Sequence, residues 1–512
     1  MKVVIVGGVA GGATAAARIR RLDEHAEITV FERSGYISYA NCGLPYYIGD
    51  VITDPEELTL QTPESFFKRF HVNMKIHHEV ISIHPDRKTV SVKNLENGEI
   101  FEENYDKLIL SPGAKPTQPR LPGAGIDKLF TLRTVEDTFQ IKEYINNNHP
   151  KSALLAGGGF IGLELAENLR ELGMDVTIVQ RPKQLMNPFD PDMASMIHNE
   201  MRKHGIKLVL GYTVEGFKGK DNGVEVLLKD NPSLQADMVV LAIGVTPDTV
   251  LAKEAGLELG IKESIVVNDR METSVPDIYA AGDAVQVKHY VTGNDALISL
   301  AGPANKQGRI IADNICGGDS RYLGSQGSSV IKVFDMTAAT TGINETNAKK
   351  SGLEVDTAIH AGLNATQLKD LDLAYAPPYS SAKDPVNMAG FMIDNIAKGT
   401  LKQWHLEDMD KISKDKDVVL LDVRTVGEFS RGHIDGFKNI PVDELRERIS
   451  EIEKGKPVYL ICQSGLRSYI ASRILEGNGY ETYNFSGGFR FYDAVVNDRA
   501  LIERAYACGM DY

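Results

Sequence analysis

The sequence predicts an α/β protein built from several domains, and three observations support this. The chain has 512 residues, too many for one hydrophobic core, and at roughly 100–200 residues per domain it should form about three or four units. Its 42% hydrophobic and 25% charged residues are ordinary for a folded globular protein. Short apolar runs alternate with helical segments through glycine-rich turns, which is typical of parallel sheets covered by helices.

Charge, apolar runs and cysteine usage limit the classes of function. A formal net charge of -14 opposes binding to nucleic acid or to an anionic membrane surface, so neither partner is expected. No run approaches the roughly 18 apolar residues that span a bilayer, and the strand-like Val3–Val6 begins without the features of a secretory signal. The four cysteines form no C-x-x-C pair and no metal-type cluster with histidine. We therefore expect a cytoplasmic protein without a metal site.

A strand, a glycine-rich turn and a small-residue helix occur twice, in residues 2–22 and 152–173. A second strand follows each copy, in residues 28–34 and 176–182, and completes a β-α-β unit. The free amides and the dipole of a helix N-terminus stabilise a pyrophosphate that approaches such a turn. The repeat therefore predicts two Rossmann-like nucleotide-binding folds.

The first glycine turn has the features of an adenosine dinucleotide site. Gly7 and Gly12 allow the sharp bend, and Glu32 lies 20 positions after Gly12, where a carboxylate can accept hydrogen bonds from both ribose hydroxyls. Val9 stands where a glycine is usual, and a turn that only packs a helix on a strand is the alternative. The second turn fits the pattern fully, with Gly157, Gly159 and Gly162.

The glycine turns, ISYANCGLPYYIG, SPGA, VTPD and DIYAAGDA resemble the flavoprotein pyridine nucleotide-disulfide oxidoreductases, specifically the coenzyme A-disulfide reductase branch. The resemblance covers nearly the whole chain. It implies that the first repeat binds FAD and the second NADH or NADPH, with the FAD domain split around the NAD(P) domain. The expected domains are FAD-binding 1–148, NAD(P)-binding 149–248, FAD-binding 249–322, a shortened α+β dimerisation domain 323–400 and a C-terminal domain 401–512.

The resemblance also implies the residues that contact each cofactor. For FAD these are Gly7, Val9, Ala10, Gly11, Gly12, Glu32, Arg33, Val80, Ser111, Gly113, Ala114, Arg133, Asp283 and Ala301. For NAD(P) they are Gly157, Gly159, Phe160, Ile161, Gly162, Gln180, Arg181 and Gly244. Phe160 matches an aromatic residue that covers the flavin until nicotinamide displaces it; packing in the core is the alternative.

Cys42 has no partner cysteine two or four residues away, so a single-cysteine mechanism is expected. Only a thiolate is nucleophilic, and we expect Cys42 to lie against the flavin as a thiolate stabilised by a helix N-terminus. Its attack on a disulfide or polysulfide gives a mixed disulfide that the reduced flavin cleaves. Polar surroundings rich in Gly and Pro disfavour the inert core role that we assign to Cys316.

Coenzyme A contact is implied for Arg18, Arg21, Ser38, Asn41 and Asn305. Arg18 and Arg21 share one helix face, and arginine forks suit phosphates. A solvated basic helix face is the alternative.

The chain departs from the family pattern at three places. Val9-Ala10 leaves no histidine in the first glycine turn, which disfavours peroxide reduction but keeps NADH oxidation through a Cys42 sulfenic acid as an alternative. Gln180-Arg181 replaces the carboxylate of NADH-selective members, so specificity should lean towards NADPH, unless Arg181 only faces solvent. Between residues 361 and 371 the chain lacks several dozen residues of the dimerisation domain, and Tyr375 and Tyr379 remain as candidate acids. A homodimer is still expected.

Near the C-terminus, the strand-like residues 458–461 run into the loop Cys462–Arg467 and then a helix. Loop amides that converge on one sulfur lower the pKa of a thiol and stabilise a persulfide, and Arg467 should add a positive charge at the rim. With LLDVR, GHIDGFKNIP and FSGGF, this loop resembles rhodanese domains, and its length matches sulfurtransferases. Structural roles are expected for Asp422, Arg424 and His433, and a catalytically inactive docking module is the alternative.

The sequence therefore predicts an enzyme that reduces coenzyme A disulfide, coenzyme A persulfide or polysulfide with NAD(P)H and FAD through Cys42, and that transfers sulfur on Cys462. All three substrates present the same S–S bond to a thiolate, so all three remain candidates. A protein of a different class, an NAD(H)-binding redox sensor that docks a partner through its rhodanese unit, is the alternative.

Overall fold

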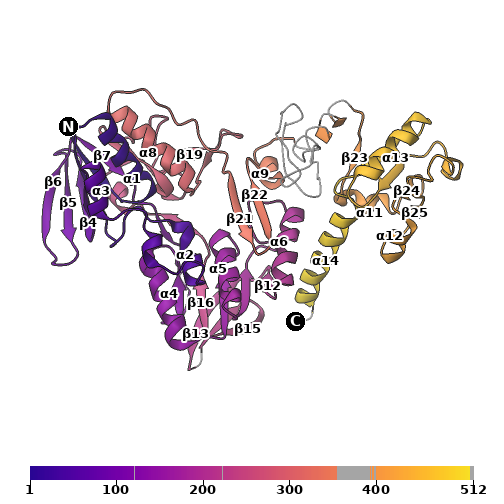
Figure 1. Ribbon diagram of the computed structural model, residues 1–512, viewed down its shortest axis with the longest axis horizontal. Helices are drawn as coiled ribbons and strands as arrows, with labels where there is room; N and C mark the ends of the chain where they lie inside the picture. Colours follow the sequence, from indigo (N-terminus) through magenta and orange to yellow (C-terminus); the bar gives the residue numbers. More distant parts are fainter. Residues whose placement is uncertain (120, 222, 355–391, 394, 397–398, 508–512) are drawn as a thin grey trace. The chain divides into compact units, whose positions relative to one another are not determined.

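The computed structural model describes residues 1–119, 121–221, 223–354, 392–393, 395–396 and 399–507, and both of its compact units have the expected α/β architecture (Figure 1). Residues 1–353 belong to the first unit and residues 354–504 to the second. Across the described ranges, no helix combines the length and the apolar character that a membrane crossing requires.

The first nucleotide fold is a five-stranded parallel sheet in the order β18-β7-β1-β2-β3. Its strands are β1 (Lys2–Val6), β2 (Glu27–Phe31), β3 (Asn73–Lys75), β7 (Lys107–Leu110) and β18 (Ile278–Ala280). Helices α1 (Ala10–Leu22) and α8 (Ala301–Ile315) pack against each other. Since β18 and α8 come from residues beyond 277, the chain returns to this fold after leaving it.

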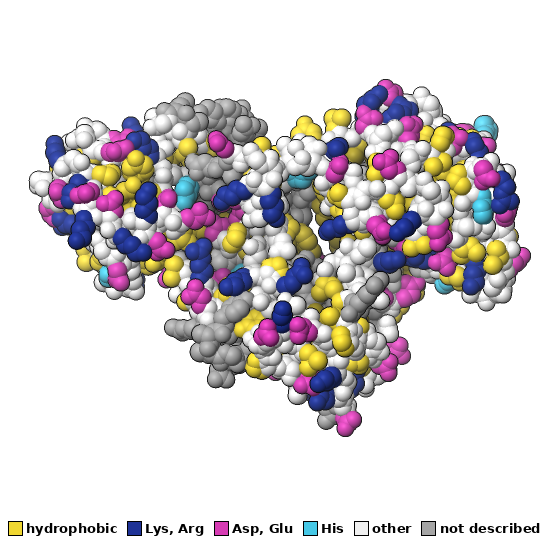
Figure 2. Space-filling model, turned by 180° about the vertical axis from the view of Figure 1, so that it is seen from behind, with side chains coloured by type: hydrophobic (Ala, Val, Ile, Leu, Met, Phe, Trp, Pro, Cys, Tyr) yellow, Lys and Arg dark blue, Asp and Glu magenta, His cyan; other side chains and the backbone are white. Residues whose placement is uncertain are grey.

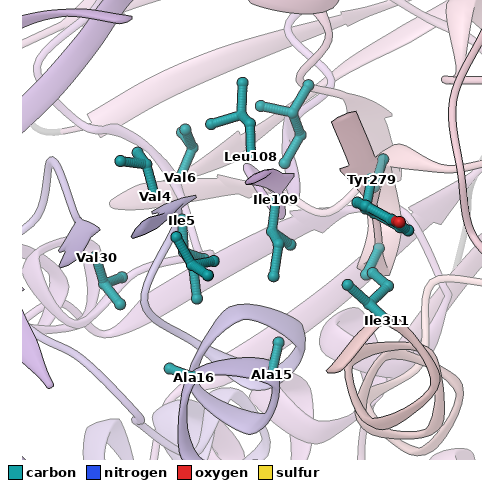
Figure 3. Close-up of a cluster of buried hydrophobic side chains, with 14 of the residues drawn as sticks. Val4, Ile5, Val6, Ala15, Ala16, Val30, Leu108, Ile109, Tyr279 and Ile311 are labelled. Atoms are coloured by element: carbon teal, nitrogen blue, oxygen red, sulfur yellow. The ribbon is translucent and has the colours of Figure 1, made fainter. Parts of the chain in front are cut away.

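Hydrophobic side chains fill the space between this sheet and its helices. Figure 3 shows Ile5 and Ile109 on the side of the sheet that faces Ala15 and Ala16 of α1. Val4, Val6 and Leu108 point to the opposite side, as the alternation of side chains along a strand requires. All of these residues are buried. Their packing fixes the end of β1, where the first glycine turn begins.

The second nucleotide fold is another parallel sheet, in the order β12-β11-β10-β16-β9. Its strands are β9 (Leu129–Thr131), β10 (Ser152–Ala156), β11 (Asp175–Gln180), β12 (Lys207–Leu210) and β16 (Met238–Leu241). The longer helices of this region are α4 (Val135–Asn148), α5 (Phe160–Glu171) and α6 (Pro191–Lys203). An antiparallel sheet follows, made of β13 (Val214–Lys220), β14 (Gly223–Leu228) and β15 (Asn231–Ala236).

Smaller elements complete the first unit. An antiparallel sheet joins β4 (His78–His84), β5 (Thr89–Asn94) and β6 (Ile100–Asn104), and two short ladders pair β8 (Ala114–Pro116) with β17 (Val245–Pro247) and β19 (Val287–Lys288) with β20 (Asp295–Ala296). The short helices are η1 (Asn41–Gly43), α2 (Leu44–Ile48), η2 (Pro55–Leu58), α3 (Pro63–Phe70), α7 (Val250–Glu254), η3 (Ile261–Glu263) and η4 (Gly282–Ala284). The hairpin of β21 (Ser329–Val333) and β22 (Met336–Thr340) and helix α9 (Glu345–Lys350) follow.

The second unit contains a parallel sheet in the order β23-β27-β26-β24-β25. Its strands are β23 (Gln403–Trp404), β24 (Val419–Asp422), β25 (Lys438–Asn439), β26 (Val458–Ile461) and β27 (Thr482–Phe485). Its helices are η5 (Leu406–Asp408), α11 (Met409–Ile412), α12 (Val426–Arg431), η6 (Ile449–Glu451), α13 (Leu466–Gly477) and α14 (Gly488–Ala507). The loop between the central strand β26 and α13 carries Cys462.

Charges of both signs are interspersed over the face seen in Figure 2. The acidic net charge is therefore not gathered into one patch on that face.

Candidate active sites

The first glycine turn leaves no room for side chains at two positions. Gly7 has a φ of 96°, and a Cβ there would lie 2.1 Å from the carbonyl oxygen of Ser111; a Cβ at Gly12 would lie 2.0 Å from that of Gly7. Helix α1 then begins at Ala10, and no side chain caps it at Val9. The first amides of an uncapped helix are free to bind an anion, so the turn fits the pyrophosphate of a dinucleotide.

Glu32 holds this turn from the end of β2. Its carboxylate accepts hydrogen bonds from the amide of Gly8 at 2.8 Å and from that of Ser34 at 2.9 Å. Burial raises the pKa of Glu32, and the two amides oppose that increase. A carboxylate fixed beside the turn is suited to bind ribose hydroxyls as well.

Further predicted FAD residues surround the same turn. Arg133 pairs with Asp283 at 2.6 Å, and Ala301 is the exposed first residue of α8, which also has no side-chain cap. A Cβ at Gly11 would lie 2.8 Å from the Ser111 hydroxyl. The chain therefore brings two uncapped helix starts and an Arg-Asp pair to one region, and these residues fit FAD.

The remaining predicted FAD residues have varied surroundings. Arg33 pairs with Asp248 at 2.8 Å. Gly113 has a φ of 70° and Ala114 is buried in β8. The Val80 side chain is buried in the hydrophobic core, which leaves only its backbone for a cofactor.

The second glycine turn repeats the first. A Cβ at Gly157 would lie 2.2 Å from the Ala242 carbonyl oxygen, and one at Gly162 would lie 2.2 Å from that of Gly157. Helix α5 begins at Phe160 after the uncapped Gly159. Phe160 and Ile161 are only partly buried, so Phe160 is not an enclosed core residue.

Gln180 takes the place that Glu32 has in the first turn. Its side-chain oxygen accepts a hydrogen bond from the Gly158 amide at 3.0 Å, so it supports the turn, a role that the sequence did not reveal. Arg181 is exposed. Gly244, with a φ of 106°, accepts a hydrogen bond from the Thr117 amide at 2.9 Å.

Cys42 lies in η1 as a free, exposed cysteine. The segment before it is tied to the first turn, because the Ser38 amide donates to the Gly8 carbonyl at 2.9 Å. Helix α2, directly after it, packs against α5 of the second turn. Cys42 is thus placed between the two nucleotide folds.

The support of a Cys42 thiolate by a helix N-terminus stays a prediction. Partial burial raises the pKa of the Cys42 thiol, and the charge of Glu164 raises it further. Helix α2 has only five residues, and a dipole that short contributes little.

Two carboxylates of α5 were missed by the sequence interpretation. Burial, and then the charge of Glu167, raise the pKa of Glu164 to about 7. Glu167 itself forms an ion pair with Lys332 of β21 and accepts a 2.8 Å hydrogen bond from the Phe334 amide. Their spacing of three positions in α5 was the available signal.

The predicted coenzyme A residues of α1 and α8 share one pocket. Its lining is Thr14, Arg18, Arg21, Asn305, Lys306 and Arg309. Arg18 forms an ion pair with Asp313 at 2.8 Å, whereas Arg21 is exposed. Asn305 accepts a 2.8 Å hydrogen bond from the Thr14 hydroxyl. Arg21 is therefore more available than Arg18 to bind a phosphate.

The other two predicted coenzyme A residues lie beside Cys42. Ser38 has a φ of 46°, and the buried side-chain oxygen of Asn41 has no hydrogen-bond partner in the described part of the chain. Tyr375 and Tyr379 lie outside the described residues.

Cys462 lies at the start of the loop between β26 and α13 and is 1% exposed. Its sulfur accepts hydrogen bonds from the Gly465 amide at 3.1 Å and from the Ser468 hydroxyl at 3.3 Å. A Cβ at Gly488 would lie 2.6 Å from the Ser464 amide, so the following segment supports the loop closely. Donors that converge on sulfur suit a thiolate or a persulfide.

The positive charge that was predicted at the rim of this loop is paired. Both carboxylate oxygens of Glu428 accept hydrogen bonds from Arg467 at 2.7 Å. Arg467 lowers the pKa of Glu428 to about 2. The sequence analysis did not foresee this pairing, because Glu428 lies 39 positions away in sequence.

Asp422 and Arg424 have the structural roles that were predicted. Arg424 donates to Asp422 Oδ1 at 3.1 Å, to Asp422 Oδ2 at 2.9 and 2.7 Å, and to the Gly432 carbonyl. Its guanidinium also lies 3.8 Å from the centroid of the Phe489 ring. His433 stacks on Phe429.

A cluster of Glu200, His204 and Asp335 has the residue types of a metal site. Lys203 already pairs with Glu200 at 3.2 Å and with Asp335 at 3.5 Å. Lys203 thus neutralises the two carboxylates. We therefore assign these residues a structural role, which is to attach the β21–β22 hairpin to α6.

Comparison with known proteins agrees with this arrangement. Residues 1–308 match the family described as pyridine nucleotide-disulphide oxidoreductase, and residues 405–494 match the rhodanese-like domain. Coenzyme A disulfide reductase of Staphylococcus aureus (strain JH9) is 34% identical over 440 residues, which cover 76% of this chain and 99% of that protein.

Two solved structures extend the similarity to the second unit. Reduced CoADR-RHD of Bacillus anthracis is 44% identical with a TM-score of 0.93, covering 97% of this chain and 98% of that one. An NAD-dependent persulfide reductase from A. fulgidus is 34% identical with a TM-score of 0.88, covering 96% of this chain and 100% of that one. The chain belongs to the pyridine nucleotide-disulphide oxidoreductase family and carries a C-terminal rhodanese-like domain.

Proposed function

We propose that the chain reduces coenzyme A disulfide, coenzyme A persulfide or polysulfide with NAD(P)H through Cys42, and transfers sulfane sulfur on Cys462. The observation that carries this proposal is the position of Cys42. Its thiol is free and exposed, its segment is bonded to the Gly8 carbonyl, and the next helix packs on α5. A nucleophile between two nucleotide folds is suited to S–S chemistry.

The residues around the two turns are proposed to hold FAD and NADH or NADPH. Glu32 fixes the turn assigned to FAD, and Gln180 fixes the turn assigned to the nicotinamide cofactor. When bound, FAD would supply a two-electron carrier between NAD(P)H and the mixed disulfide on Cys42.

The Cys42 thiolate is proposed to attack one sulfur of R–S–S–R′, forming a Cys42–S–S–R bond as R′S⁻ leaves. Two electrons from NAD(P)H then cleave the new bond and regenerate the thiolate and the second thiol. With a persulfide or polysulfide, the product includes sulfide. Arg18, Arg21, Ser38, Asn41 and Asn305 are the residues assigned to coenzyme A.

The amide of Gly465 and the hydroxyl of Ser468 are proposed to hold the outer charge of a Cys462 persulfide. An acceptor thiolate attacks the outer sulfur, which leaves with the acceptor as Cys462 returns to the thiolate. A homodimer and a cytoplasmic location complete the proposal.

The test is a substrate panel on the wild type, Cys42→Ser and Cys462→Ser. NADH and NADPH consumption and sulfide release are measured with each of the three sulfur substrates. Cys42→Ser should abolish turnover while flavin reduction by NAD(P)H persists, and Cys462→Ser should lose only sulfur transfer. Disulfide and polysulfide turnover that survives in Cys42→Ser would refute the assignment.

The same panel, with oxygen as sole acceptor, separates the alternatives. An NADH oxidase that works through a Cys42 sulfenic acid would consume oxygen faster than any sulfur substrate. A redox sensor would bind NAD(H) but reduce its flavin slowly, without release of thiol.

A further inference from the structure

We propose that Asn484 directs the hydroxyl hydrogen of Ser468 to the sulfur of Cys462, and that it is thereby a positioning residue for sulfur transfer. This inference rests on the proposed function of Cys462. Asn484 belongs to β27 and is 3% exposed. It acts on the sulfur through the loop that follows β26, and the argument for this role begins at one carbonyl oxygen of that loop.

Three donors meet at the carbonyl oxygen of Gly465. The backbone amide of Tyr469 lies 3.1 Å from this oxygen, the Ser468 hydroxyl 3.1 Å, and the side-chain amide nitrogen of Asn484 3.2 Å. The Tyr469 bond is the first helical bond of α13, so the helix itself keeps it in place. A carbonyl oxygen has two lone pairs, and Asn484 and Ser468 therefore compete for the second one.

Ser468 has a second acceptor within reach, which is the sulfur of Cys462 at 3.3 Å. A hydroxyl carries one hydrogen, so Ser468 donates to the sulfur or to the Gly465 carbonyl but not to both at once. When Asn484 occupies the second lone pair of that carbonyl, the Ser468 hydrogen is left for the sulfur. The sulfur then has two donors, because the Gly465 amide also donates to it at 3.1 Å.

The stability of the sheet does not account for an amide at position 484. The side-chain oxygen of Asn484 is buried and has no hydrogen-bond partner among the described residues, and the same holds for both polar atoms of Gln403, its register partner in β23. A buried polar atom without a partner costs stability, and leucine would fill a similar space without that cost. The bond that the Asn484 side chain does make goes to Gly465, the residue whose amide donates to the sulfur.

The Ser468 hydrogen acts when the Cys462 persulfide gives up its outer sulfur. An acceptor attacks the outer sulfur, the S–S bond breaks, and its electron pair stays on the Cys462 sulfur, which leaves as a thiolate. With cyanide as acceptor, the persulfide anion and the cyanide anion become the Cys462 thiolate and thiocyanate, so sulfur and charge balance. Two donors on the Cys462 sulfur stabilise the negative charge that develops there.

The test is a double-mutant cycle on the discharge of the persulfide. The full chain is loaded with thiosulfate, freed of the excess and mixed with cyanide, and the persulfide that remains on Cys462 is followed by quenched-flow mass spectrometry. Asn484→Leu and Ser468→Ala should each slow the discharge about tenfold. Because both act through the same hydrogen, the double variant should be less than about twofold slower than Ser468→Ala alone.

Gln403→Leu is the matched control, because it removes another buried amide of the same sheet that has no hydrogen bond to the loop. Its discharge rate should stay within about twofold of the wild type. Asn484→Ala, which cannot overfill the site, repeats the cycle if Asn484→Leu does not fold. Neutron diffraction of the deuterated wild type gives a readout without a variant: the Ser468 deuterium should be directed at the Cys462 sulfur.

Losses that multiply in the double variant, to about 100-fold, would overturn the inference and give Asn484 a structural role that is independent of Ser468. An unchanged rate in the Asn484 variants, or a Ser468 deuterium directed at the Gly465 carbonyl, would overturn it as well. If the wild type takes up no persulfide from thiosulfate, the proposed function of Cys462 fails, whereas the position of the deuterium still decides the inference.

Discussion

The Arg467 guanidinium makes two 2.7 Å hydrogen bonds to Glu428, one to each carboxylate oxygen. Thr425 reinforces the pair, because its amide and hydroxyl both donate to Glu428. The rim of the Cys462 loop therefore carries a neutralised arginine, which reduces the attraction for a dianion such as thiosulfate.

Glu428→Gln should raise the efficiency of sulfur transfer from thiosulfate about three- to tenfold, because the guanidinium becomes free. Initial rates with thiosulfate and with an uncharged sulfur donor measure the effect. Glu444→Gln, which breaks the exposed pair with Arg448, is the matched control. A loss with both donors would instead mean that Glu428 shapes the loop.

The same pair should respond to acid in a defined direction. Arg467 holds the folded-state pKa of Glu428 at about 2, below its ordinary value of 4.5. A lowered folded-state pKa contributes stability above the unfolded value that is lost as pH falls from about 4.5 towards about 2. Wild-type stability should therefore decrease more than that of Glu428→Gln over this range in urea titrations, and parallel curves would contradict this.

Arg181→Ala should lower kcat/KM for NADPH about tenfold and leave that for NADH within about twofold, because the exposed guanidinium is available to a 2′-phosphate. Steady-state kinetics with both cofactors provide the measurement. Arg87→Ala, at an exposed arginine paired with Glu102, controls for loss of surface charge. A strong NADH preference of the wild type would remove Arg181 from cofactor choice.

Arg21→Ala should raise KM for coenzyme A disulfide about tenfold without changing KM for inorganic polysulfide, since only the former carries phosphates. Arg18 is held by Asp313, so Arg18→Ala should also lower stability. A KM change with both substrates would indicate a general disturbance of α1.

Gly12→Ala should strongly reduce the FAD content of the purified protein, because its Cβ would lie 2.0 Å from the Gly7 carbonyl oxygen. Flavin absorbance per protein is the measurement. Gly125→Ala, where a Cβ meets nothing within 4 Å, is the control. Full flavin content in Gly12→Ala would show that the turn is not the cofactor site.

Arg424→Met should destabilise the second unit by about 3–5 kcal/mol, because it leaves the Asp422 carboxylate buried without a cation. The side chains are 2% and 0% exposed. Trp404, the single tryptophan of the chain, is buried in this unit and reports its unfolding by fluorescence in urea. A double replacement, Asp422→Leu with Arg424→Met, should recover most of the loss.

Local patterns carried most of what the sequence predicted. Both β-α-β units, their glycine turns and the Cys462 loop depend on residues close together in the chain, and they are present as expected. Glu32 could be recognised because its spacing from the turn is fixed by the strand. The same reasoning assigned Gln180 to cofactor choice but missed its bond to Gly158.

Contacts between distant segments could not be predicted in this way. Lys332 meets Glu167 across 165 positions, and Arg467 meets Glu428 across 39. Such pairs depend on how elements pack, and no spacing rule encodes them. The ion pair of Glu167 and the neutral rim of the Cys462 loop therefore emerged only from the three-dimensional arrangement.

The hydrogen bond between Gln180 and the Gly158 amide also bears on how this lineage can change coenzyme. Glutamate has the same reach as glutamine and can accept the same hydrogen bond, and the codons of the two amino acids differ by one nucleotide. A single base change could thus introduce a charge that repels NADPH while the turn keeps its shape. Selection could move the enzyme between the two reductant pools without first passing through a misfolded intermediate.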